Sequence, residues 1–107
     1  MKSIHAKRFL NSKWKFSCHP YWPKKVDLEK EFVYLCEDEF HAERGSFILD
    51  LGWYPDGNRN GSYCLRLIDT DDGGWERPMA LIRTRDIGVL TKFRDLMIKV
   101  ANKAANK

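Results

Sequence analysis

The sequence predicts a single α+β domain in which an antiparallel β-meander of about four to five strands packs against a C-terminal α-helix. Two observations favour this fold class. The middle of the chain alternates apolar and polar residues, as strands with one buried face do. After Thr84 the apolar spacing changes to that of an amphipathic helix. The 107 residues suffice for one hydrophobic core, so we expect residues 1–107 to form one domain.

Ahead of the central strands, the chain predicts two further strands separated by loops. Residues 14–18 alternate apolar and polar side chains and favour a short strand, whereas residues 4–10 fit a strand or a helix. Residues 19–23 are predicted to be a loop, because each proline lacks an N–H and restricts the residue before it. Phe32–Cys36 is rich in β-branched and aromatic residues and predicts a strand. The polar residues 37–45 predict a turn.

The centre of the chain predicts a β-hairpin. Residues 46–54 and 62–68 each alternate in the manner of a half-buried strand. Between them, residues 55–61 contain two glycines, two asparagines, one aspartate and one proline, which are turn-forming residues. The residues expected to face the core are Phe47, Leu49, Leu51, Trp53, Tyr63, Leu65 and Leu67.

A second turn and a last strand follow the hairpin. Asp69–Gly74 is rich in aspartate and glycine and predicts a turn. Trp75–Arg83 is predicted to be a strand, with the part around Met79–Ile82 in the sheet. Pro78 favours an edge position for this strand, because proline cannot donate to a ladder. Its apolar residues are Trp75, Met79 and Leu81.

The chain ends in a predicted helix from about Asp86 to Lys103. Its apolar residues recur every three or four positions and form one stripe, which can cover one face of the meander: Ile87, Leu90, Phe93, Leu96, Met97, Val100 and Ala101. Thr84 or Asp86 can cap the N-terminus of the helix. Lysines in its last turns suit the negative end of the helix dipole.

Composition indicates a cytoplasmic protein. No apolar run approaches the roughly 20 residues that span a bilayer, and the first residues lack the apolar core of a signal peptide. The three cysteines, Cys18, Cys36 and Cys64, are an odd number without a close pair. We therefore expect free thiols rather than disulfides, and no membrane association.

Charge is distributed unevenly along the chain, although the net charge is only +4. Residues 1–25 contain seven lysines and arginines and no acidic residue. Residues 26–72 contain twelve acidic residues against four basic ones, and residues 73–107 contain eight basic residues against three acidic ones. The opposite signs either neutralise one another in the fold or form separate surface fields.

The motifs of common catalytic and metal sites are missing from the sequence. Cys18-His19 and the pair Cys36 and His41 have no matching second pair for zinc. Acidic neighbours of Cys36 would raise the pKa of a thiol rather than activate it. The aspartates after Ile68 lack the final glutamate of a calcium loop, and the glycines form no phosphate-binding pattern. We expect a non-enzymatic protein without metal or cofactor.

The basic N-terminal block interleaves lysines with aromatic residues and could bind nucleic acid through phosphates and stacking. The alternative is that these aromatic residues belong to the core and the lysines are solvated. The acidic middle segment would repel a polyanion, which disfavours nucleic acid without excluding it.

A series of segments in the second half of the chain resembles a known family. They are Leu51-Gly-Trp-Tyr-Pro-Asp-Gly57, Gly61-Ser-Tyr-Cys-Leu-Arg-Leu-Ile68, Trp75-x-x-Pro78 and Arg83-Thr-Arg-Asp86 before the final helix. Over about residues 46–103 this pattern resembles small immunity proteins of bacterial polymorphic-toxin systems, notably those of contact-dependent growth inhibition. The resemblance implies that the partner is a cognate toxin domain, often a nuclease, neutralised by tight one-to-one binding.

If the toxin is a nuclease, its phosphate-binding site is basic and an acidic surface would complement it. The acidic candidates for partner binding are Glu37, Asp38, Glu39, Asp69, Asp71 and Asp72. Aromatic residues are enriched among interface hot spots, and the aromatic candidates are Trp53, Tyr54 and Trp75. The alternative, that Trp53 and Trp75 lie in the core and the acidic residues are merely solvated, stays open at this point.

Overall fold

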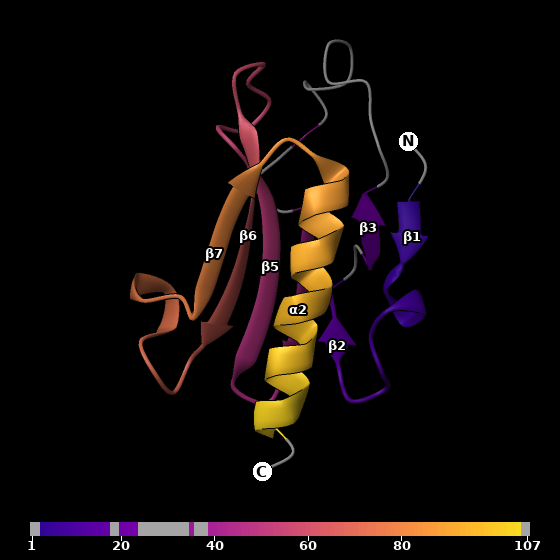
Figure 1. Ribbon diagram of the computed structural model, residues 1–107, viewed down its shortest axis with the longest axis vertical. Helices are drawn as coiled ribbons and strands as arrows, with labels where there is room; N and C mark the ends of the chain where they lie inside the picture. The colour runs from indigo at the N-terminus through magenta and orange to yellow at the C-terminus, as the bar shows by residue number, and fades with distance from the viewer. Residues whose placement is uncertain (1–2, 18–19, 24–34, 36–38, 106–107) are drawn as a thin grey trace.

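The computed structural model describes residues 3–17, 20–23, 35 and 39–105, and it has the α+β architecture that the sequence predicts. The strands of the larger sheet are β2 (Lys15–Phe16), β4 (Phe40–Arg44), β5 (Phe47–Tyr54), β6 (Ser62–Asp69) and β7 (Ala80–Thr84). They lie in the order β2-β4-β5-β6-β7, and all are antiparallel to their neighbours. Helix α2 (Ile87–Ala105) lies across one face of this sheet (Figure 1). We call this side the helix face and the opposite side the far face.

Strand β4 occupies most of the segment 37–45, for which we predicted a turn. The prediction was wrong because the polar residues of this strand obscured its alternation, in which Phe40 and Ala42 are buried. β4 pairs with β5 along its whole length, so Gly45 and Ser46 alone connect them. Gly45 has a φ of 58°, the left-handed conformation that a two-residue hairpin link favours.

The central hairpin of β5 and β6 confirms the sequence prediction. The two strands pair over eight residues each, from Phe47 opposite Asp69 to Tyr54 opposite Ser62. The predicted inward residues of both strands are buried on the helix face. Because β5 is the middle strand of the sheet, its far-face residues through Gly52 are buried as well.

Strand β7 is an edge strand, as predicted, but it is shorter than the predicted segment. Residues 74–76 form a 3₁₀ turn, and the strand begins only after Pro78. Met79 and Leu81, two of the apolar residues of the predicted strand, are both 46% exposed. Ala80 and Ile82 pack against the core instead, because Ile82 lies opposite Leu65 in the register.

Helix α2 follows β7 after a tight link in which Asp86 provides the N-cap. The carboxylate of Asp86 accepts a hydrogen bond from the backbone N–H of Val89 at 3.1 Å, and its carbonyl accepts from that of Leu90. The hydroxyl of Thr84 in turn accepts from the N–H of Asp86 at 3.0 Å. Both residues suggested as caps therefore take part in starting the helix.

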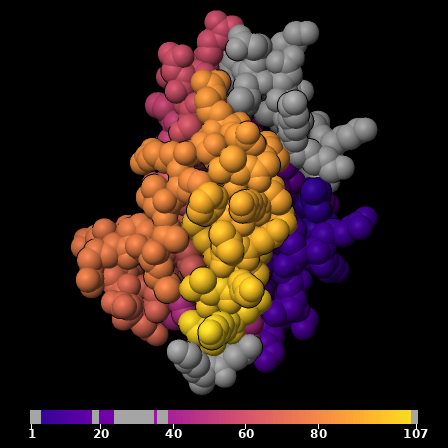
Figure 2. All heavy atoms as spheres, in the orientation of Figure 1, coloured from indigo at the N-terminus to yellow at the C-terminus, as the bar shows by residue number. Residues whose placement is uncertain are grey.

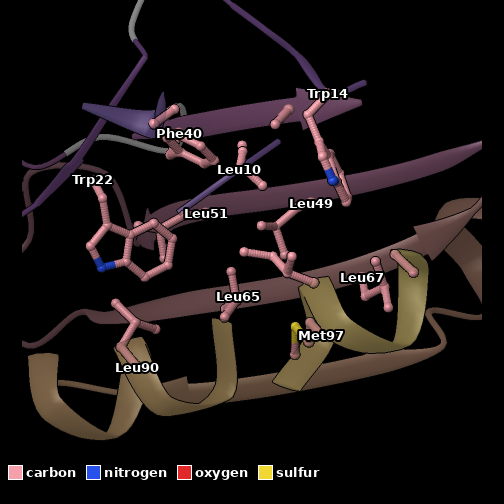
Figure 3. Packing of buried hydrophobic residues seen from close by; sticks show 14 of the residues in the cluster. Leu10, Trp14, Trp22, Phe40, Leu49, Leu51, Leu65, Leu67, Leu90 and Met97 are labelled. Atoms are coloured by element: carbon pink, nitrogen blue, oxygen red, sulfur yellow. The ribbon is translucent and has the colours of Figure 1, made fainter. Parts of the chain in front are cut away.

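Only some of the apolar residues of α2 pack against the core. Leu90, Met97 and Ala101 are buried, and Figure 3 shows Leu90 and Met97 reaching toward the leucines of β5 and β6. Phe93, which we expected in the core, is 39% exposed. The wide stripe in the sequence is thus split between two surfaces of the helix.

The N-terminal segment covers the part of the helix face next to β2 and β4, beside α2. It contains strands β1 (Ser3–His5) and β3 (Tyr21–Pro23), which form a two-stranded antiparallel sheet. The prediction of a loop at residues 19–23 was wrong for the part that β3 occupies. Pro23 is compatible with β3 because it is the last residue of the strand, opposite Ser3. Pro20 precedes the strand, and its carbonyl accepts a hydrogen bond from the backbone N–H of Ala6.

Two tryptophans attach this segment to α2. The indole of Trp22 donates to the hydroxyl of Thr91 at 3.2 Å. The indole of Trp14 donates to the side-chain oxygen of Asn102 at 2.8 Å, which also accepts from Arg44 at 2.7 Å. Trp14 and Trp22 are almost fully buried and belong to the core, whereas Tyr21 is about half exposed.

Most of the strand predicted at Phe32–Cys36 lies outside the described residues; Leu35, which is described, is buried. Of the cysteines, Cys18 and Cys36 also lie outside the described residues, and Cys64 is a buried free thiol. Among the described residues, no helix is both long and apolar enough to cross a membrane.

Truncation to alanine should affect the stability of the protein differently for a leucine on the helix face and for a leucine on the far face of the sheet. We expect Leu65→Ala to lower the free energy of unfolding by about 2–5 kcal/mol, because it leaves a cavity under α2. Leu81→Ala, a matched truncation of a residue 46% exposed on the far face, should cost a small fraction of that. Urea unfolding of both variants measures the difference, and equal losses would show that the two faces are wrongly assigned.

Candidate functional site

The acidic residues predicted to bind a partner do not form one patch. Glu37 and Asp38 lie outside the described residues. Glu39 is half-buried just before β4, level with Gly52 in the register, and its backbone N–H donates to Leu51 at 2.9 Å. Asp69 lies opposite Phe47, about 17 Å away at 3.3 Å per residue along β5. Glu39 and the aspartate turn are therefore at opposite ends of the sheet.

The aspartate turn at residues 69–72 is largely exposed. The hydroxyl of Thr70 donates to the carbonyl of Ser46 at 3.0 Å, whereas the polar bonds of the aspartates are local. The carboxylate of Asp69 accepts from the backbone N–H of Asp71 at 3.0 Å, a bond that shapes the turn itself. Asp72 pairs with Arg77 at 3.7 Å, with both side chains strongly exposed. Such surface pairs contribute about 0–1 kcal/mol. Asp71 and Asp72 are available to a partner, but nothing in the turn orders them for one.

The three aromatic candidates have different environments. Trp53 is fully buried; its indole donates to the carbonyl of Asn58 at 2.9 Å and its ring packs edge-on against Tyr63. The expectation that Trp53 could serve as an exposed anchor is therefore wrong, and the alternative of a core residue holds. Trp75, by contrast, is half exposed on the 3₁₀ turn before β7.

Tyr54, the remaining aromatic candidate, belongs to a polar network on the far face. Its hydroxyl accepts a hydrogen bond from Arg66 at 3.4 Å, and the guanidinium of Arg66 lies 5.2 Å from the centre of its ring. Arg66 also approaches the buried carboxylate of Asp50 at 4.0 Å. Asp50 is opposite Arg66 on one side and His41 on the other, so the sheet register brings these charges together.

His41 lies between two carboxylates in this network. Its Nδ1 is 3.3 Å from Asp50, and its Nε2 is 3.1 Å from Glu43. Burial alone would lower the pKa of His41, but the hydrogen bonds and charges of Glu43 and Asp50 outweigh it and raise the pKa above 6.5. Because a carboxylate binds each ring nitrogen of His41, the three side chains are arranged to stabilise a charged imidazole rather than to transfer a proton to a substrate. The described residues include no cluster of three or more side chains that could hold a metal ion.

The surface that sequence reasoning missed lies on α2. Four large apolar residues, spaced four, three and four positions apart, form an exposed line that we call the helix stripe: Val89, Phe93, Leu96 and Val100. Their side chains are 39–50% exposed, although each has the spacing of a core residue. The signal was present in the sequence, since α2 carries more apolar positions than one buried face needs.

Helix geometry places the helix stripe on the flank of α2 that faces β7. At about 100° per residue, the stripe points about 110° away from the buried residues of α2. Thr91 and Asn102, which bind the N-terminal tryptophans, lie on the opposite flank. In Figure 2 the lobe formed by the residues before β7 projects to the left of the helix, opposite the indigo N-terminal segment. The stripe thus continues toward the half-buried Ala80 and Ile82 of that edge strand.

A row of lysines borders the helix stripe on its solvent side. By the same helical geometry, Lys92, Lys99 and Lys103 lie next to the stripe and away from the sheet, and all three are exposed. The neighbouring Asp95 binds Arg94 at 2.8 Å rather than any of these lysines. The surface is therefore apolar along its centre and positively charged along one edge.

Comparison of the chain with known protein families, with curated proteins and with solved structures finds no match.

The raised pKa of His41 makes stability depend on pH in a defined direction. The protonated ring is stabilised in the folded state, so this contribution is complete below the unfolded pKa of about 6.5 and is lost as pH rises through the folded value. Between about pH 6 and pH 8, wild type should lose more unfolding free energy than His41→Gln, which lacks the ionisable ring. An NMR titration that placed the pKa of His41 at or below 6.5 would contradict the network described here.

Proposed function

We propose that this chain is a protein-binding module that neutralises its partner by stoichiometric binding, as an immunity protein does toward its cognate toxin domain. The helix stripe is the single observation that carries the binding part of this proposal. Soluble monomers expose isolated apolar residues routinely, but a continuous line of four large ones marks an interaction surface. The immunity part rests on the resemblance of residues 46–103 to that class of proteins.

The dimensions of the surface suit a protein partner. At 1.5 Å per residue, the 19 residues of α2 extend about 28 Å, and the stripe occupies most of that length. A groove that binds one face of a helix contacts residues three and four positions apart, and the residues of the helix stripe have this spacing. Residues that become fully buried at the centre of an interface contribute most of its affinity, while charged residues at the edge mainly govern the rate of association.

The charge of the surface indicates the character of the partner. Lysines along one edge of the stripe would be complemented by acidic side chains around an apolar groove. A second copy of the chain fits less well, because antiparallel pairing through the stripe would bring both rows of lysines to the same side. The charge pattern therefore favours a different protein over a second copy. The helix stripe, rather than the acidic turns, is the centre of the proposed interface.

The experiment compares two leucines of similar exposure on opposite faces of the sheet. Leu96→Glu places a charge in the middle of the stripe, and Leu81→Glu places the same charge on the far face. The tagged chain, expressed in the cells that encode it, should recover one partner in a one-to-one ratio. We expect Leu96→Glu to weaken that binding at least about tenfold and Leu81→Glu to change it little.

The same variants test the immunity part of the proposal. The recovered partner, expressed alone in a bacterial host, should arrest growth, and co-expression of wild type or Leu81→Glu should restore it. Leu96→Glu should fail to protect. A harmless partner would contradict the immunity role while leaving the binding surface intact, whereas equal binding by both variants would contradict the surface. Recovery of nucleic acid alone, with affinity falling steeply in salt, would favour the alternative of a nucleic-acid-binding module.

A further inference from the structure

A pocket lies on the other flank of α2, away from the helix stripe. It has a volume of about 680 Å³ and is lined by Ile4, His5, Arg8, Phe9, Tyr21, Thr91 and Arg94. Its walls are the N-terminal segment with the β1–β3 sheet on one side and the middle of α2 on the other. The volume is within the range of about 300–1,000 Å³ typical of small-molecule sites.

Arg94 is the most constrained group of the pocket. It is only 7% exposed, and its guanidinium lies 3.9 Å from the centre of the Phe9 ring and 5.1 Å from that of Trp22. Both Nε and Nη2 donate to one carboxylate oxygen of Asp95, at 2.9 and 2.8 Å. These contacts fix the plane of the guanidinium, and none of them uses Nη1. A preorganised donor of this kind loses little entropy when it binds an anion.

The other polar side chains of the pocket are also donors. The hydroxyl oxygen of Thr91 already accepts from Trp22, which leaves its proton free to donate. Nδ1 of His5 accepts from the backbone N–H of Lys7 at 3.1 Å, so the ring proton of neutral His5 is on Nε2. Arg8 is exposed and has donors only. The described residues that line the pocket include no carboxylate, and the first 25 residues of the chain contain no acidic side chain.

The remaining surface of the pocket is apolar and partly aromatic. Phe9 packs against Trp22 and Phe40, which fixes its ring as part of the wall. Tyr21 is about half exposed at the pocket and is held edge-on by His5 at 5.2 Å. A planar group could stack on such rings while its charged end reached the arginines.

From this arrangement we infer that the pocket binds a small organic anion, an aromatic ring that carries one carboxylate or phosphate group. Arg94 and Arg8 bind the anionic group, with Thr91 and His5 as additional donors. Tyr21 and Phe9 contact the ring. The site is independent of the helix stripe, which lies on the opposite flank of α2, so it stands whether or not the proposed partner is found.

The test uses the whole chain and four probes that separate the two parts of the ligand. Phenyl phosphate and benzoate carry the ring with each type of anion, benzyl alcohol carries the ring alone, and inorganic phosphate carries the anion alone. Calorimetric titration at low salt should show at least one of the two aryl anions binding at least about tenfold more tightly than benzyl alcohol and inorganic phosphate. Which aryl anion binds distinguishes carboxylate from phosphate ligands.

Variants of two neighbouring basic residues complete the test. Arg8→Gln should weaken binding of the preferred aryl anion about tenfold, because a charge-assisted hydrogen bond is lost. Lys7→Gln removes the same charge from the adjacent exposed position, which does not line the pocket, and should leave the affinity within about twofold. Neither exposed residue is part of the core, so both variants should fold. Absence of binding by both aryl anions, or equal losses in the two variants, would overturn the inference.

Discussion

One helix has to cover a sheet that is wider than itself, and the rest of the structure depends on this constraint. A helix is about 10 Å across, whereas five strands at 4.8 Å spacing extend about 19 Å between the outermost axes. Helix α2 lies against the centre of the helix face, and the N-terminal segment fills the side next to β2 and β4 through Trp14 and Trp22. The described residues include no such cover beside β7, where Ala80 and Ile82 are only half-buried.

The two flanks of α2 differ chemically as a result. On the N-terminal flank, buried aromatic rings surround Arg94 and leave a pocket whose polar side chains are mostly donors. On the β7 flank, the helix stripe leaves large apolar side chains in solvent beside a row of lysines. About half of the stripe's apolar surface stays in solvent and therefore does not stabilise this fold. This exposure is the physical reason to look for a partner there.

The sequence predicted the elements whose pattern is unambiguous. The β5–β6 hairpin alternates over eight residues in each strand, and α2 has a capping residue, so both were predicted nearly to their ends. Sequence pattern was less informative where burial depends on tertiary contacts. Strand β4 looked polar because its far-face residues are His41 and Glu43. The sequence could not show which face of α2 is buried, because apolar residues cover more than one side of the helix. The arginine pocket had no sequence signal, since its walls come from residues more than 60 positions apart.

The proposed interface requires that the helix stripe is exposed in the isolated chain and covered in the complex. Hydroxyl-radical footprinting read by mass spectrometry measures this directly at Phe93 and Leu96, with the buried Leu90 as an internal reference. We expect Phe93 and Leu96 to be oxidised in the free chain and protected once the partner is bound, while Leu90 stays protected throughout. Protection of Phe93 and Leu96 in the free monomer, or unchanged oxidation in the complex, would contradict it.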